Sequence, residues 1–494
     1  MGNSRTQVIS NKMPKWLLVI LLLIPILVAC FQIRILDNDF YFLYPTGEYI
    51  VKNGFPHTDF LSMHTNMEIT VQQWLSSVFF YYAYSLFGKY GVITLIYICY
   101  AVINYLLYRL ALLISRNELL SVLITWLSGF FLFFHFMVSR PHIFTYIVIL
   151  LEVYLLEKFI QTKKWTFLIG IPVLSVLQIN LHASMWPMIF VFMAPFIVSA
   201  ALSFSKRLRK YACGGLFPLL IAMISGIIAG FINPYGLTNM LYMTSTAGHE
   251  HINLIGEMKS TSAESIYGLV FFALLLAMGI ISFAKKEKPF ELRYFLLFAG
   301  TLFIALKHYK GIPYFLFLGI PSFGYMLSDV KFSISFPFKK SKRNTILTAA
   351  FLAVTLVCIC ISLCDFSKKI NQPKIDRYEQ LDNVIGKKKK KNEKIILFTG
   401  FDDSQYFEFH GYPAFVDGRA ELFLKKNNGE CDYFEEYYDF IKGKKYYRVF
   451  LEKYGFNYLV FNKDESQNVY LPLMHDKDYE LIYESENVYL FKKK

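Results

Sequence analysis

Three carboxylates in one short polar stretch have the residue type and spacing for proton-transfer chemistry. Asp37 and Asp39 lie within three residues of each other, directly after the first long apolar run, and Asp59 follows a turn that contains Gly54 and Pro56. A carboxylate can take or orient the proton of a weakly nucleophilic hydroxyl group, and a neighbouring acid or partial burial tunes its pKa for that role. An exposed polar loop would show the same residues, so their chemistry depends on which groups they meet.

Cations and hydrogen-bond donors at the ends of later apolar runs could assist a departing phosphate, because they would stabilise the charge that develops on it. The candidates for this role are Arg140, Lys307, His308 and Lys310. Lys307 and Lys310 would share one helical face if their helix continues through both. Further candidates for the same cavity are His142, His182, Asn233, His249 and His251. Each of these alone is more typical of a helix cap or a packing contact.

Asp37 and Asp39 could also hold a divalent ion, because hard cations prefer carboxylate oxygens. No third acid is clustered with them in the sequence, so we expect a reaction that needs neither a metal nor another cofactor. The polar C-terminal tail contains no Gly-rich phosphate loop, no Ser-His-Asp arrangement and no His-Glu-x-x-His spacing.

The chain that must position these residues is strongly apolar. Of its 494 residues, 55% are hydrophobic and only 18% are charged, and many apolar runs approach the length of a bilayer crossing. The net charge of +14 does not indicate a nucleic-acid partner, because Lys and Arg are scattered in short loops between apolar runs. That distribution orients helices in membranes. The sequence therefore predicts a mainly α, polytopic transmembrane protein.

We predict eleven membrane spans from the apolar runs. Their approximate ranges are 16–33, 90–108, 118–138, 143–158, 166–180, 186–203, 213–232, 265–284, 293–306, 312–328 and 345–364. Residues 73–87 form a further aromatic helix that could cross the membrane or lie in its interface. We expect it to lie in the interface, because only then do the basic loops fall on the same side as the basic N-terminus.

This topology places the N-terminus in the cytoplasm and the polar candidate residues outside. The loop 34–88, which holds the three acids, and all of the candidate cations, histidines and Asn233 then share the external side, whereas plain Lys and Arg runs stay inside. Their common side, rather than any one of these residues, predicts a shared cavity.

The chain divides into a transmembrane domain, 1–364, a basic linker, 365–394, and an extracytoplasmic α/β domain, 395–494. Strands of the last domain are expected near 395–398, 458–461, 479–484 and 487–492, and helices near 432–442 and 445–454. Asp417 and Arg419 are expected to pair and to fix a turn.

The order of these motifs resembles the bacterial members of the C-type glycosyltransferase superfamily, which are related to protein O-mannosyltransferases and lipid A aminoarabinose transferases. The resemblance runs from about residue 15 to the C-terminus and begins with Asp-x-Asp-aromatic, T-G-E-Y-I-V-K-N-G-F-P and a Trp-Leu pair. Later matching segments are S-R-P-H-I-F-T-Y, I-N-L-H-A-S, I-N-P-Y-G-L, K-H-Y-K-G-I-P-Y-F and F-V-D-G-R-A-E-L-F. The chain departs from the pattern at Gln72-Gln73, where His-Glu is usual, and at Leu43, where His is usual.

The resemblance implies a multi-pass enzyme of a bacterial cell membrane. Such an enzyme takes a hexose or pentose from a polyprenyl-phosphate carrier and transfers it to an extracytoplasmic lipid, glycan or protein acceptor. An acid of the first external loop acts as the base or orients the acceptor; Asp39 matches it best, with Asp37 and Asp59 as neighbours.

Three other functions are compatible with the same pattern. They are a lipid or glycan transporter, a non-catalytic scaffold of the same fold, and an oligosaccharide polymerase or ligase that uses a diphosphate carrier. Only Glu152 lies clearly inside a predicted span and no internal repeat is found, which weighs against a transporter.

Overall fold

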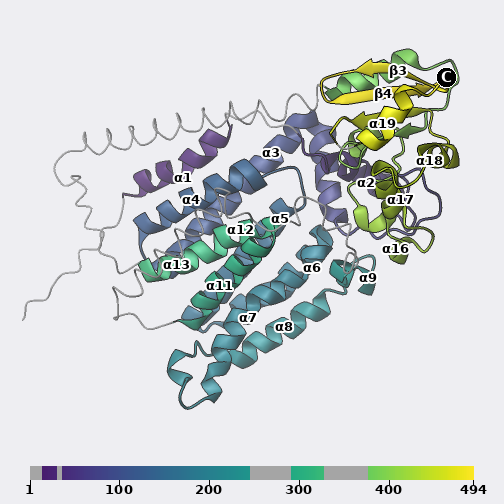
Figure 1. Ribbon diagram of the computed structural model, residues 1–494. Coiled ribbons are helices and arrows are strands. Elements are labelled where there is room, and N and C mark those ends of the chain that lie inside the picture. The colour runs from purple at the N-terminus through teal and green to yellow at the C-terminus, as the bar shows by residue number, and fades with distance from the viewer. Residues whose placement is uncertain (1–13, 31–35, 245–290, 328–376, 465) are drawn as a thin grey trace, which may run out of the picture.

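The computed structural model describes residues 14–30, 36–244, 291–327, 377–464 and 466–494. Long helices form a bundle, and the C-terminal part of the chain lies at one end of it (Figure 1). The predicted spans 265–284 and 345–364 lie outside the described residues, as do His249 and His251.

Helices occupy each of the other predicted spans. They are α1 (Lys15–Cys30), α3 (Trp74–Ser115), α4 (Glu118–Phe136), α5 (His142–Thr162), α6 (Gly170–Leu181), α7 (Pro187–Ala201), α8 (Leu216–Ala229), α11 (Leu292–Lys307), α12 (Ile312–Tyr314) and α13 (Ile320–Leu327). Within the described ranges, three helical segments are long and apolar enough to cross a membrane, namely Trp74–Ser115, Glu118–Phe136 and Ala183–Phe204. The mainly helical fold is thus confirmed, whereas the number of eleven spans is not.

Helix α3 consists of two helical segments separated by a break at Phe87 and Gly88. Gly88 has a φ of +58°, a value that residues with a Cβ atom rarely adopt. The first segment is the predicted aromatic helix, and the second contains the predicted span 90–108. That the first segment lies in a membrane interface remains a prediction.

Helix α2 (Phe40–Asn53) packs tightly against the first segment of α3. At Gly47 the two backbones are so close that an added Cβ would overlap the carbonyl group of Ser77. Phe40 and Phe80 are fully buried between the helices, with their ring centroids 6.3 Å apart and edge to face. The T-G-E-Y motif therefore fixes α2, and with it the acids that precede α2.

The C-terminal part contains one four-stranded sheet. Its strands are β1 (Leu397–Phe398), β2 (Tyr458–Asn462), β3 (Tyr479–Glu484) and β4 (Val488–Lys493), in the order β1-β2-β4-β3. β1 runs parallel to β2, and β4 runs antiparallel to both β2 and β3. The accompanying helices are α15 (Ser404–Phe409), α16 (Lys425–Asn428), α17 (Tyr433–Ile441), α18 (Tyr447–Tyr454) and α19 (Gln467–Met474). The predicted strands and helices of the tail are confirmed within a few residues.

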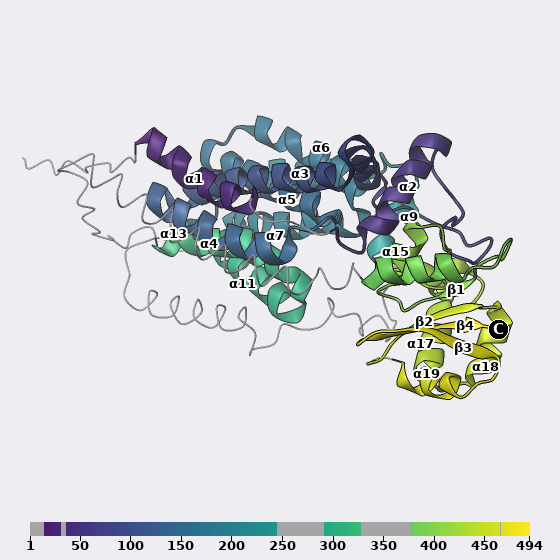
Figure 2. The same cartoon turned by 90° about the horizontal axis from the view of Figure 1, so that it is seen from above.

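Both faces of this sheet are covered. Figure 2 shows α15 on the side that faces the bundle and α17, α18 and α19 on the opposite side. Tyr458 and Val460 belong to the core that continues into the bundle, whereas Leu459 and Phe461 belong to a separate core with α17 and α18. Alternate residues of a strand point to opposite faces, so a continuous apolar strand suits a sheet that is buried on both faces.

Part of the predicted basic linker is helical and packed. Residues 377–388 form a helix, and Tyr378, Leu381 and Ile385 are at most 1% exposed in the main core. Their spacing of three and four residues is typical of one helical face. The same spacing is present in the sequence. The adjacent lysine run, however, gives the segment as a whole the composition of a polar linker.

Candidate functional site

Asp37 and Asp39 lie at the N-terminal end of α2 and share one cation, Arg140. The Arg140 Nε atom is 2.6 Å from Asp37 Oδ1 and 3.2 Å from Asp39 Oδ2. The Asp37 backbone N–H donates to Ser139 Oγ at 2.8 Å, and the Asp39 backbone N–H donates to Asp37 Oδ1 at 3.2 Å. The Asp39 side chain remains 27% exposed. Arg140, expected at the donor phosphate, thus contacts the proposed catalytic acids directly.

Two histidines lie close to each other, and one of them, His142, is within electrostatic range of Arg140. His142 begins α5 just after Arg140, and its ring centroid lies 4.5 Å from that of His182, which follows α6. His182 Nδ1 is 3.2 Å from the Thr145 hydroxyl oxygen. His142 Nε2 is buried and has no hydrogen-bond partner among the residues that the structure describes. Lys310 is within electrostatic range of both imidazoles.

Lys307 and Lys310 would share a helical face only if one helix continued through both, and this condition is not met. Helix α11 ends at Lys307, and His308 is extended, with φ of −140° and ψ of 131°. A 3-10 turn, Tyr309–Gly311, follows, and a Cβ at Gly311 would lie 2.5 Å from the carbonyl oxygen of Ile304. The chain therefore folds back at this point, leaving Lys307 exposed and Lys310 near the histidines.

Asn233 has a structural role in a turn. Its Nδ2 donates to the carbonyl oxygens of Gly230 at 2.8 Å and Gly236 at 3.1 Å, and its Oδ1 accepts from the Tyr235 N–H at 2.9 Å. This turn presents Tyr235, whose hydroxyl group donates to the carbonyl oxygen of Pro56 in the first loop at 3.0 Å.

Asn180 and Gln72 also connect the first loop and the start of α3 with the segment at the end of α6. Asn180 Oδ1 accepts from the Trp74 indole N–H at 2.7 Å, and Gln72 Oε1 accepts from the Ser184 N–H at 3.1 Å. The Gln72 carbonyl oxygen accepts from the Ala183 N–H at 2.8 Å. These hydrogen bonds hold the first loop against the bundle. A structural role therefore accounts for Asn180 and Gln72.

Asp59 binds the C-terminal part of the chain. Its Oδ1 is 2.5 Å from Arg419 Nη1, and its Oδ2 accepts from the Ser62 N–H at 2.9 Å. Burial opposes ionisation, but the charge of Arg419 and the hydrogen bonds from Ser62 outweigh it and lower the pKa of Asp59. Arg419 Nε also lies 3.0 Å from both Asp417 carboxylate oxygens, which confirms the predicted pair. Asp59 thus forms an ion pair with a residue 360 positions later in the chain, a link that sequence reasoning missed.

The C-terminal part also reaches the acid pair itself. A Cβ atom added to Gly418 would lie 2.5 Å from the Gln405 amide, 3.3 Å from the Phe42 ring and 3.6 Å from Asp39 Oδ1. Asn38 Nδ2 donates to the carbonyl oxygen of Asp402 at 2.6 Å. The V-D-G-R segment therefore forms a wall beside Asp39 in which a larger residue would not fit.

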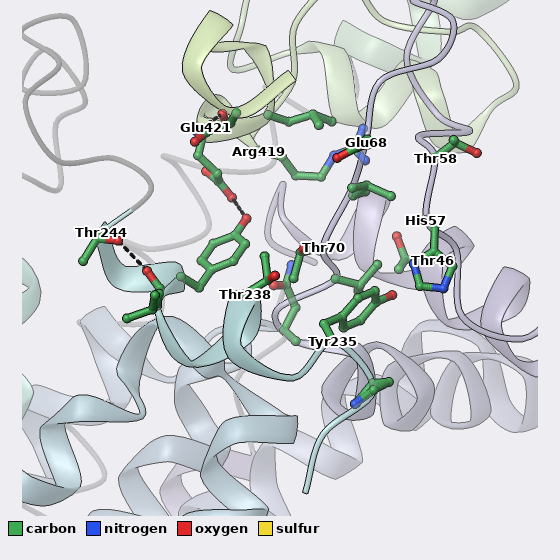
Figure 3. Close-up of a pocket in the computed structure, with 18 of the residues that line it drawn as sticks. Thr46, His57, Thr58, Glu68, Thr70, Tyr235, Thr238, Thr244, Arg419 and Glu421 are labelled. Atoms are coloured by element: carbon green, nitrogen blue, oxygen red, sulfur yellow. Dashed lines mark hydrogen bonds between the residues drawn. The ribbon is translucent and has the colours of Figure 1, made fainter. Parts of the chain in front are cut away.

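A cavity of about 890 Å³ adjoins this wall. The first loop, the segment around α9 (Leu237–Met240) and the C-terminal part all line it (Figure 3). Phe42 and Arg419 belong to its lining and flank the contact between Gly418 and Asp39. Glu421 in the wall accepts a hydrogen bond from the Tyr242 hydroxyl at 2.5 Å, and burial raises the pKa of Glu421. No motif of the sequence predicts this cavity, because its lining comes from three distant segments.

The expectation of a reaction without a metal ion stays a prediction. Among the described residues, no group of three His, Cys, Asp or Glu side chains lies close enough together to hold a metal ion. Asp37 and Asp39, the pair considered for a divalent ion, are bridged by the Arg140 guanidinium.

No protein-family model matches the sequence, and the comparison with curated proteins finds no match. Solved structures are similar in fold. The oligosaccharyltransferase of Archaeoglobus fulgidus in its apo form is 13% identical, with a TM-score of 0.56 over 91% of this chain and 69% of its own. The same enzyme tethered with an acceptor peptide that contains the NVT sequon is 12% identical, with a TM-score of 0.59 over 97% and 74%.

A second similar protein is ArnT from Cupriavidus metallidurans, in a structure bound to undecaprenyl phosphate. It is 11% identical, with a TM-score of 0.53, and the match covers 97% of both chains. Likeness at these identities concerns the fold. The chain therefore has the fold of these C-type membrane glycosyltransferases, as the order of its motifs predicts.

Proposed function

We propose that the protein is a membrane glycosyltransferase that moves a sugar from a polyprenyl-phosphate carrier to an extracytoplasmic lipid, glycan or protein. The observation that carries the proposal is the meeting of Asp37, Asp39 and Arg140 at one end of the bundle. A cluster of His142, His182 and Lys310 lies within electrostatic range of this arginine through His142. The similar structures agree with the proposal, because ArnT is bound to undecaprenyl phosphate and the oligosaccharyltransferase to an acceptor peptide.

Asp39 takes the proton of the acceptor hydroxyl group while the oxygen of that hydroxyl group attacks C1 of the donor sugar. The Arg140 charge offsets the repulsion between Asp39 and Asp37, so two carboxylates can stand side by side. The position and partial exposure of Asp39 leave room for an acceptor, whereas the Asp59 side chain is fully buried and held by Arg419. Asp39 is therefore the base, and Asp59 supports the surrounding wall.

As the new bond to C1 forms, the bond between C1 and the phosphate oxygen breaks. The electron pair of that bond stays on the leaving polyprenyl phosphate, and the configuration at C1 inverts. Lys310 and the imidazole groups of His142 and His182 stabilise this charge, because they form one cluster of cations and hydrogen-bonding groups within range of Arg140. The buried, partnerless Nε2 atom of His142 is a hydrogen-bonding group that a phosphate oxygen could satisfy.

The test is mass spectrometry of lipids that co-purify with the full chain in mild detergent. We expect a polyprenyl phosphate, with or without a hexose or pentose. Asp39→Asn should retain the carrier but enrich its sugar-loaded form, because transfer is blocked after binding. Glu48→Gln is the matched control, since it makes the same carboxylate-to-amide change on an exposed pair with Lys52 in α2.

Other outcomes would redirect the proposal. Bulk phospholipid alone, even after polyprenyl phosphate is added, would favour a transporter or a scaffold of the same fold. A diphosphate carrier in place of the monophosphate would favour a polymerase or ligase. Equal sugar loading in Asp39→Asn and in the unchanged protein would refute Asp39 as the base.

A further inference from the structure

Among the residues that the structure describes, the lining of the cavity beside the V-D-G-R wall has no excess charge. Its acidic residues, Glu68 and Glu421, equal in number its basic residues, Arg419 and Lys426. Two of these four side chains interact with other protein groups, since Arg419 forms an ion pair with Asp59 and Glu421 accepts a hydrogen bond from the Tyr242 hydroxyl. An anionic or cationic ligand would therefore find no surplus of the opposite charge here.

Hydroxyl groups dominate the rest of the polar lining. Thr58, Thr70, Thr238 and Thr244 come from the first loop and from the segment around α9, and Figure 3 shows them around the same space. The Tyr235 ring forms an aromatic part of the cavity lining. Its hydroxyl bond to Pro56 and its edge contacts with Phe55 and His57 hold it in place.

Gln73 adds an unsatisfied group to this lining. It is 8% exposed, stands directly before α3, and its Oε1 atom has no hydrogen-bond partner among the described residues. A buried acceptor without a partner is destabilising, because its hydrogen bonds to water are lost and not replaced. A neutral donor, such as a ligand hydroxyl group, would satisfy Gln73 without introducing charge.

We propose that this cavity binds a neutral saccharide and that the acceptor of the proposed transfer is accordingly a glycan. A sugar ring combines hydroxyl edges with apolar C–H faces, and the lining offers hydroxyl groups, amide groups and an aromatic ring. The volume of about 890 Å³ is typical of a ligand site. Phe42 lines the cavity one helical turn after Asp39, so a saccharide in contact with Phe42 would lie about one turn of α2 from the proposed base.

This inference rests on the proposed function, and its experiment separates the two. The full chain in lipid nanodiscs is titrated with maltotetraose, cellotetraose, chitotetraose and an uncharged peptide of eight residues rich in Ser and Thr. Saturation-transfer NMR reports binding, and binding of undecaprenyl phosphate is measured on the same samples. The test variants are Gln73→Leu, which keeps the size of the side chain, and Tyr235→Ala. The control is Tyr446→Ala, because Tyr446 is exposed and is not among the residues that line the cavity.

We expect at least one tetrasaccharide to bind. Its affinity should fall roughly tenfold or more in Gln73→Leu and Tyr235→Ala and stay unchanged in Tyr446→Ala, because a hydrogen bond or a ring contact is lost. Undecaprenyl phosphate should bind all variants equally. The glycan proposal is overturned if no tetrasaccharide binds while undecaprenyl phosphate does, if the variants have no effect, or if the peptide alone binds with this dependence. Loss of undecaprenyl phosphate binding in every sample would instead remove the proposed function.

Discussion

Removal of the Arg419 guanidinium should loosen the C-terminal part of the chain from the first loop. In Arg419→Met, Asp59 and Asp417 keep their buried carboxylates but lose their cation, and the Glu408 carboxyl group lies nearby, 3.9 Å from Arg419 Nη2. Breaking a buried ion pair by removing one partner typically costs about 3–5 kcal/mol. Since about 1.4 kcal/mol is a factor of ten, opening should become roughly 100- to 5,000-fold more frequent.

Hydrogen–deuterium exchange of the full chain in nanodiscs measures this opening. The reporter is a first-loop peptide that contains Met63, because the Met63 N–H donates to the carbonyl oxygen of Ala414 in the C-terminal part. Lys444→Met is the control, because Lys444 is 60% exposed and its ion pair with Asp439 is an exposed one. A surface pair contributes about 0–1 kcal/mol, so its loss should change exchange by less than roughly tenfold. Equal effects of the two substitutions, or less than tenfold faster exchange in Arg419→Met, would refute the reasoning.

Two further substitutions test packing and pH dependence. Gly47→Ala should lower the stability of the chain by about 1–3 kcal/mol, because its Cβ would overlap the Ser77 carbonyl; Gly300→Ala, with open space around it, should have little effect on the thermal midpoint. Burial and the nearby Asp417 raise the pKa of Glu408, so the folded chain keeps a proton that the unfolded chain releases, and stability falls as pH rises above the ordinary Glu pKa. Glu408→Gln removes this proton uptake, so its thermal midpoint should fall less between pH 5 and pH 8, and an unchanged pH profile would contradict the assignment.

The lowered pKa of Asp59 has the opposite consequence. Its ion pair with Arg419 stabilises the fold above the ordinary Asp pKa, and this contribution is lost as pH falls toward the lowered value. Asp59→Asn should therefore destabilise the chain at pH 7 and much less at acidic pH, as measured by the same thermal midpoints. A constant difference at every pH would show that packing, rather than charge, explains the effect.

Much of the secondary structure was already determined locally. The apolar runs become helices wherever the structure describes them, and Tyr458–Asn462 forms a strand because a continuous apolar stretch suits a sheet covered on both faces. The Asp417 and Arg419 pair, two residues apart, could also be predicted, because its geometry depends on one short turn.

The candidate site was decided by tertiary structure. Asp37 meets Arg140 across 103 residues, and Asp59 meets Arg419 across 360, so no local pattern indicates either pair. The sequence placed Asp59 beside the other acids because they share a loop, whereas the fold turns it toward a buried cation. Residue types and apolar periodicity determine which elements form and which groups could react. The pairing of the charges and the cavity beside the V-D-G-R wall depend on contacts between distant segments that exist only once the chain is folded.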